Sequence, residues 1–185
     1  IFDGFKRHLN AAMVIKNSKV VEIIPEEKVD PKTEQIVLAG GLLTPGFVDL
    51  QVNGGGGVLF NDNPSLENLK TICEAHAKLG STSIMPTLIS DSPEVNKRAI
   101  SAITGALDKQ INGLVGLHLE GPHLAPERKG AHEERFIRPM KEFDCLELES
   151  LANKIPKLML TIAPEAVSPQ QITRLSKAGT IISLG

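Results

Sequence analysis

The sequence predicts an α/β fold in which parallel strands alternate with helices. From Phe47 onward, five apolar segments of strand length alternate with four segments of helical period, at about 30 residues per unit. A connection of that length suits a crossover between parallel strands better than a hairpin. Before Pro45-Gly46 the pattern differs, because short β-rich runs and turns follow one another without a helix. The change at this point predicts two domains, residues 1–45 and residues 46–185.

Residues 1–45 are expected to form a small all-β unit. Met13–Ile15 and Val20–Ile24 are β-rich runs on either side of a turn at Asn17-Ser18, which predicts a hairpin. Further short strands are expected at Gln35–Ala39 and Leu42–Thr44. A unit with this small number of strands is not stable alone. It must therefore pack on other elements or take strands from elsewhere.

The second part follows a regular order. Strands are predicted over residues 47–52, 83–88, 115–120, 157–163 and 181–184, and helices over residues 65–79, 93–109, 143–152 and 168–178. In the first helix Leu66, Leu69 and Ile72 recur on one stripe, and Pro93 is well placed in the first turn of the second. The connection 121–140 is unusually long, which is typical of a functional loop.

Two architectures fit these units: a doubly wound sheet, or part of an eight-stranded barrel. A complete barrel needs about 250 residues, so a barrel in this chain would lack roughly its last three units. The glycine run Gly54–Gly57 has neither the dinucleotide nor the phosphate-loop spacing, which argues against a nucleotide site.

The composition excludes several functional classes. The 185 residues are 41% hydrophobic and 23% charged with a net charge of −2, so there is no basic footprint for nucleic acid. No apolar run approaches the roughly 18 residues of a membrane span. Cys73 and Cys145 lie far apart without metal-ligand spacing, which favours a reducing cytoplasm.

The segment Val115–Glu120 is the strongest candidate for chemistry. Side chains on a strand alternate between faces, so His118 and Glu120 share one face at the C-terminal end of an otherwise apolar strand. In parallel α/β folds this end carries the site. A buried carboxylate needs a partner, which could be a metal, a hydrogen-bond donor or a basic residue of a neighbouring loop.

Other polar residues at predicted strand ends and in the long loop are weaker candidates for the site. Gln51 and Asn53 alternate with Asp49 on one face at the end of the first strand, and are either ligand contacts or part of a loop network. His118 is either a contact of the site or a satisfied core histidine. The long loop adds His132, which could bind an anionic substrate or lie in a solvated surface.

Several motifs together resemble a known family. They are Thr44–Gly54, Phe60-Asn61-Asp62, Pro86-Thr87-Leu88, His118–Pro122, Gly130-Ala131-His132 and Leu160–Glu165. In order and spacing this set is similar to the N-acetylglucosamine-6-phosphate deacetylases of the amidohydrolase superfamily. The resemblance implies an amidohydrolase-type (β/α)8 TIM barrel, of which about five strands are present, preceded by part of a β-sandwich domain. It also implies an amino-terminal portion of a longer protein.

The resemblance assigns roles by position. Glu120 matches the carboxylate ligand of one divalent metal ion, Zn or Fe, and Ala131 and His132 match a substrate-contacting pair. Gln51 and Asn53 stand where binuclear relatives carry His-x-His, and with His118 they are expected to surround the metal site or to be vestigial ligand positions. The remaining metal ligands and the aspartate that acts as general base are expected beyond Gly185, so no catalytic residue is assigned here.

The implied activity is hydrolysis of the acetamide of N-acetylglucosamine-6-phosphate by a metal-activated water, in a cytoplasmic homodimer without nucleic-acid or membrane partners. Residues 1–185 alone are expected to be inactive. Two alternatives stay open: a non-catalytic sugar-phosphate-binding barrel fragment, and another amidohydrolase such as a dihydroorotase-like enzyme. The missing His-x-His argues against the latter.

Overall fold

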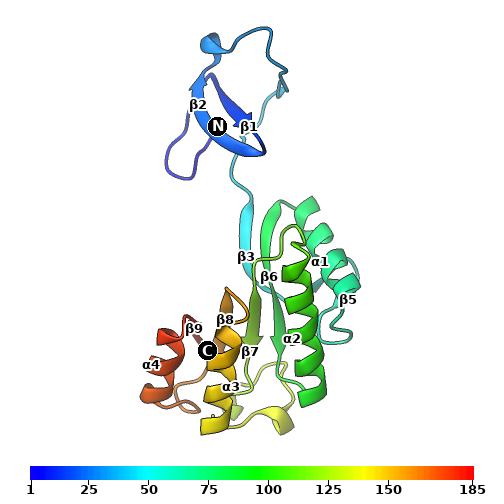
Figure 1. Cartoon of the computed structure of the whole chain (residues 1–185), viewed down its shortest axis with the longest axis vertical. Coiled ribbons are helices and arrows are strands. Elements are labelled where there is room, and N and C mark those ends of the chain that lie inside the picture. Colours follow the sequence, from blue (N-terminus) through cyan, green and yellow to red (C-terminus); the bar gives the residue numbers. More distant parts are fainter. The chain divides into compact units, whose positions relative to one another are not determined.

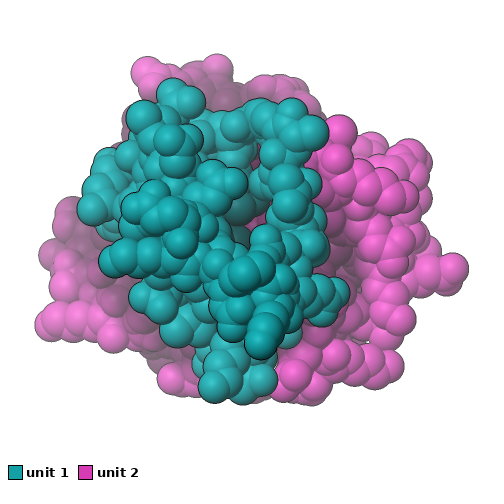
Figure 2. Space-filling view, turned by 90° about the horizontal axis from the view of Figure 1, so that it is seen from above, with its two compact units in different colours: residues 1–46 teal, residues 47–185 magenta.

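The computed structural model describes all residues 1–185, and the chain divides into two compact units, Ile1–Gly46 and Phe47–Gly185. Figure 2 draws the two units in different colours. That these units are the two predicted domains, residues 1–45 and 46–185, stays a prediction.

The first unit contains one antiparallel hairpin, formed by β1 (Ala11–Lys16) and β2 (Lys19–Pro25). Asn17 and Ser18 connect the strands with positive φ values of 52° and 59°, as the predicted turn requires. Residues 35–39 form no strand, so that prediction is wrong. Without a neighbouring strand their backbone has nothing to pair with, and Ile36 is 88% exposed. The hairpin is the only sheet here, so the predicted β-sandwich is not confirmed.

The second unit is built on a parallel sheet (Figure 1). Its strands are β3 (Phe47–Val52), β6 (Ser81–Ile89), β7 (Leu117–Glu120), β8 (Leu158–Ile162) and β9 (Ile181–Leu184). They lie side by side in chain order, and every neighbouring pair is parallel. A doubly wound sheet would reverse its order at a switch point, whereas this half-barrel sheet does not. The α/β class with five parallel strands is therefore confirmed.

Four helices connect these strands: α1 (Leu66–Lys78), α2 (Pro93–Asp108), α3 (Glu142–Ala152) and α4 (Pro169–Lys177). The side chains of Ser65, Ser92 and Ser168 accept a backbone N–H at the start of α1, α2 and α4, which explains where these helices begin. No helix is both long and apolar enough to cross a membrane.

The hydrophobic core joins the strands to the helices. Alternate residues of β8, Leu158, Leu160 and Ile162, are buried and pack in one cluster with residues such as Ile103 of α2 and Leu175 of α4. Thr161 lies between them in β8 and therefore faces the opposite side of the sheet. On that opposite side the polar residues of neighbouring strands meet.

The glycine run after β3 forms a short hairpin, β4 (Gly54–Gly55) paired with β5 (Val58–Leu59). It packs closely on α1, because a Cβ on Gly55 would stand 2.9 Å from the ring of His76. His76 Nε2 lies 2.9 Å from the carbonyl oxygen of Gly54. The run therefore allows close packing of backbone on a helix.

Candidate functional site

The site is organised around Glu120, the last residue of β7. In the sheet it is in register with Ile89 of β6 and Thr161 of β8, so it lies at the carboxyl edge of the strands. Its side chain is 21% exposed, which leaves the carboxylate open on one side only. This is the edge at which parallel α/β folds place their chemistry.

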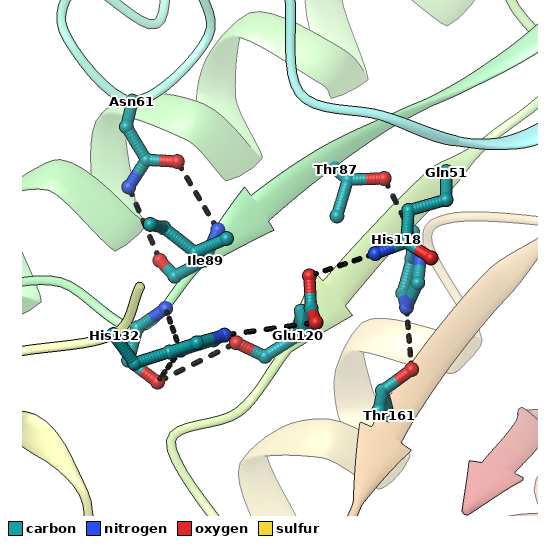
Figure 3. A network of polar contacts seen from close by, with 9 residues as sticks. Gln51, Asn61, Thr87, Ile89, His118, Glu120, His132 and Thr161 are labelled. Carbon is teal, nitrogen blue, oxygen red and sulfur yellow. Dashed lines mark hydrogen bonds and ion pairs between the residues drawn. The ribbon is translucent and has the colours of Figure 1, made fainter. Parts of the chain in front are cut away.

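Two side chains contact the Glu120 carboxylate (Figure 3). Gln51 of β3 donates from Nε2 to Oε2 at 3.1 Å, and Nε2 of His132 lies 3.6 Å from Oε1. The contact with His132 lowers the pKa of Glu120, with a smaller contribution from Gln51, and outweighs the effect of burial, which acts in the opposite direction. Glu120 is therefore held as an anion.

The orientation of His132 follows from its other ring nitrogen. The backbone N–H of Ser90 donates to Nδ1 at 3.2 Å, and the Ser90 hydroxyl lies 2.8 Å from the same atom. Since Nδ1 accepts a hydrogen bond, the proton of the neutral imidazole is on Nε2. That N–H points toward Glu120.

His118 lies beside this pair but is fully engaged with the strands. Its Nδ1–H donates to the carbonyl oxygen of Leu50 at 3.0 Å, and the hydroxyl of Thr161 donates to Nε2 at 2.7 Å. The residue is 2% exposed, and burial lowers the pKa of the imidazole, so it is neutral. This arrangement favours the expectation that His118 supports the site from the sheet.

The comparisons with known proteins agree on one kind of relative. Over 80% of its length the chain is 43% identical to an N-acetylgalactosamine-6-phosphate deacetylase from a Shewanella species. Over 93% it is 38% identical to an N-acetylglucosamine-6-phosphate deacetylase from Haemophilus influenzae. The crystal structure of the Pasteurella multocida N-acetylglucosamine-6-phosphate deacetylase covers 95% of the chain with a TM-score of 0.89 at 38% identity. No family model matches the chain.

The chain is homologous to the amino-terminal portion of the amino-sugar-6-phosphate deacetylases. It spans less than half the length of these relatives, namely 37%, 45% and 46% of them in the same order. The resemblance predicted from the motifs is thereby confirmed.

The remaining residues predicted from the deacetylase resemblance are less closely involved. Asn53 follows β3 and its carbonyl accepts the N–H of Phe60 at 2.8 Å, while its side chain is exposed and makes no hydrogen bond within the cluster. Ala131 is exposed next to His132 in the loop. The structure therefore brings together Gln51, His118, Glu120 and His132, but not Asn53.

Sequence reasoning gave no role to Asn61, Thr87, Ser90 and Thr161. Asn61 accepts the N–H of Ile89 and donates to its carbonyl oxygen, both at 3.1 Å, and so brackets the end of β6. Asn61, Thr87 and Thr161 stood within the motifs that resemble the deacetylases, which was the available signal. Ser90 carried none, because its partner His132 is 42 residues away.

The side chains around Glu120 can be compared with the needs of a metal site. Glu120 is a hard anionic donor with an open side, which fits one ligand position of a Zn²⁺ or Fe²⁺ ion. Gln51 presents its NH₂ group, a donor that cannot bind a cation. No group of three or more His, Cys, Asp or Glu side chains is arranged to hold a metal ion. Glu120 therefore fits one ligand position, and these residues by themselves do not form a complete metal site.

A separate cavity of about 110 Å³ lies between the sheet, α2 and α3. It is lined by Ile100, Leu148, Leu160 and His123 among others, and neither Glu120 nor Gln51 lines it. Ser90 and Gly121 line it as well, so the cavity borders the residues that directly follow β6 and Glu120.

Proposed function

We propose that the chain provides the Glu120-bearing part of a deacetylase that hydrolyses the acetamide of N-acetylglucosamine-6-phosphate to glucosamine-6-phosphate and acetate. The observation that carries the proposal is the anionic Glu120 at the carboxyl edge of the sheet, held by Gln51 and His132. The names of the relatives supply the reaction and the substrate.

In this proposal Glu120 holds one divalent metal ion, Zn or Fe, together with ligands outside residues 1–185. When bound, such an ion would lower the pKa of a water molecule toward neutrality, so that its deprotonated form is available as the nucleophile for the amide. Glu120 supplies charge and geometry and does not transfer the proton. The general base is an aspartate outside these residues, as the resemblance implies.

The chain's own residues then have distinct tasks. Gln51 fixes one oxygen of Glu120, which leaves the carboxylate a single orientation. His132 presents an N–H at the open side, and with Ala131 it contacts the substrate. His118 ties β7 to β3 and β8 through Leu50 and Thr161 and keeps the edge of the sheet in place.

The proposal extends to the barrel and sandwich architecture of the protein and to its oligomeric state. We infer an amidohydrolase-type (β/α)8 barrel, of which β3, β6, β7, β8 and β9 are the first five strands, with the hairpin β1–β2 belonging to a β-sandwich. The strand order supports the barrel. We also infer a homodimer in the cytoplasm, where the buried free thiols of Cys73 and Cys145 would stay reduced.

A second candidate substrate is N-acetylgalactosamine-6-phosphate. The observation in its favour is the Shewanella relative, which is 43% identical and named for that sugar. The two substrates differ in the configuration at one carbon of the ring, and none of the contacts around Glu120 discriminates between them.

The test is acetate release by the intact protein that contains these residues, with each of the two phosphorylated sugars and with unphosphorylated N-acetylglucosamine as a control. We expect the highest kcat/KM with N-acetylglucosamine-6-phosphate. A preference for the galactosamine compound would establish the second candidate. Binding of either sugar phosphate without acetate release would instead support the non-catalytic alternative.

A further inference from the structure

We propose that Ser90 is a positioning residue that sets the orientation of His132 in the deacetylase site. The inference rests on the proposed function, because it is that function which gives His132 a substrate to contact. It concerns Ser90, a residue to which the sequence assigned no role. Ser90 directly follows β6, on a segment distant in sequence from the loop that carries His132.

Ser90 contacts Nδ1 of His132 twice. Its backbone N–H lies 3.2 Å and its hydroxyl oxygen 2.8 Å from that atom. Both residues are 6% exposed, so water does not compete freely for these bonds. Two donors directed at one ring nitrogen favour the tautomer with the proton on Nε2, the atom that faces Glu120.

Ser90 is itself held in place by Asn61. The Asn61 amide binds both backbone groups of Ile89 (Figure 3). It also donates to a carboxylate oxygen of Asp91 at 2.9 Å. The residues on both sides of Ser90 are thereby fixed. A chain of contacts therefore runs from the loop after β5, through the end of β6, to the imidazole at the mouth of the site.

The Ser90 hydroxyl is in close contact with the segment that follows Glu120, and Ser90 also lines the cavity between the sheet, α2 and α3. A Cβ added to Gly121 would stand 2.2 Å from the Ser90 hydroxyl oxygen, so the backbone after Glu120 passes directly over it. The hydroxyl also lies 3.5 Å from the carbonyl oxygen of Glu120. Ser90 thus links the strand that carries Glu120 to the loop that carries His132.

The experiment compares Ser90→Ala with Ser90→Thr in the intact deacetylase. Ser90→Ala removes the hydroxyl and keeps the backbone N–H, whereas Ser90→Thr keeps both donors. We expect Ser90→Ala to raise KM about five- to tenfold with little change in kcat, and Ser90→Thr to stay within about twofold of the wild type. Equal loss in both variants, with unchanged folding, would overturn the proposal.

A double-mutant cycle separates positioning from general structural damage. In a His132→Ala background, Ser90→Ala is expected to change KM by less than about twofold, because its partner is gone. If the KM of the double variant instead rose by the product of the two single-variant factors, the proposal would be overturned. Asn61→Ala provides a second variant that leaves Ser90 itself intact, and it should raise KM in the same direction.

A spectroscopic readout does not depend on turnover. In ¹⁵N NMR of the wild type at fixed pH, Nδ1 of His132 should give the signal of an unprotonated nitrogen and Nε2 that of a protonated one. In Ser90→Ala the two signals should move toward each other as the second tautomer becomes populated. Unchanged signals would overturn the positioning role. Failure of the wild type to release acetate would overturn the proposed function instead.

Discussion

Gln51 and Glu120 are joined by a hydrogen bond of 3.1 Å although 69 residues separate them in the sequence. β6 lies between their two strands in the sheet, so the bond crosses from the edge strand β3 to β7. Such a bond is possible where the sheet curves and its polar face is concave. Gln51 therefore marks the inside of the curved sheet, and Glu120 is the anionic group placed there.

Glu120→Ala should abolish metal retention in the intact protein. The variant removes the carboxylate of the cluster formed by Gln51, His118, Glu120 and His132, and a metal site without it loses charge and one coordination position. Metal content after dialysis, measured by elemental analysis, checks this. Glu127→Ala, an exposed change in the following loop, is the matched control and should retain metal. Full metal content in Glu120→Ala would refute the ligand role.

His132→Ala should raise KM about five- to tenfold and leave kcat nearly unchanged, if its contact with substrate is equally strong in the ground state and the transition state. Steady-state acetate release measures both constants. Arg128→Ala, at an exposed position of the same loop, should leave both constants unchanged. A large loss of kcat at constant KM would show that His132 acts mainly in the transition state.

The regular part of the fold could be predicted because its signals are local. The strand at 47–52 follows from an apolar run bounded by glycines, and the helix from Pro93 follows from a proline after a serine cap. The strand at Gln35–Ala39 failed because β-rich composition does not provide a neighbouring strand. Local sequence therefore indicates an element only where the fold supplies its partner.

The candidate site was only partly predictable. Glu120 and His118 stood out because a carboxylate and an imidazole are unusual on an apolar strand. The contact of Ser90 with His132 depends on how a loop folds back over the sheet edge, and serine after a strand is too common to be a signal. The sequence thus identified Gln51, His118, Glu120 and His132 as site residues, while the role of Ser90 required the structure.

Arg138→Ala should lower the free energy of unfolding by about 1–2 kcal/mol. This loss is smaller than that for breaking a fully buried ion pair, because the Arg138 side chain is 40% exposed. The guanidinium binds both carboxylate oxygens of Asp144, at 2.6 and 2.5 Å, and Asp144 is nearly buried. Arg135→Ala is the matched control, since Arg135 pairs with Glu133 on the surface, where a salt bridge contributes little. Urea unfolding of both variants measures the difference, and equal midpoints would contradict it.

Acidification should destabilise the protein through His123. Burial lowers the pKa of this imidazole below 6.5, an effect that the contact with the Arg138 carbonyl and the charge of Asp144 only partly oppose. As pH falls below about 6.5 the unfolded state binds a proton that the folded state excludes, so stability is lost, by up to about 1.4 kcal/mol per pH unit. In His123→Gln the free energy of unfolding should fall less steeply between pH 7 and pH 5. Identical slopes would show that His123 is not the responsible group.

Gly116→Ala and Gly105→Ala should change stability in opposite directions. A Cβ on Gly116, just before β7, would stand 1.9 Å from the carbonyl oxygen of Lys157, a backbone atom that cannot move without disturbing the start of β8. A Cβ on Gly105 in α2 meets nothing within 4 Å, and alanine is favoured over glycine inside a helix by up to about 1 kcal/mol. Thermal unfolding should therefore show a lower midpoint for Gly116→Ala and a higher one for Gly105→Ala. If Gly116→Ala were neutral, β7 and β8 could not be packed as closely as the structure shows, and the position of Glu120 relative to Thr161 would have to be reconsidered.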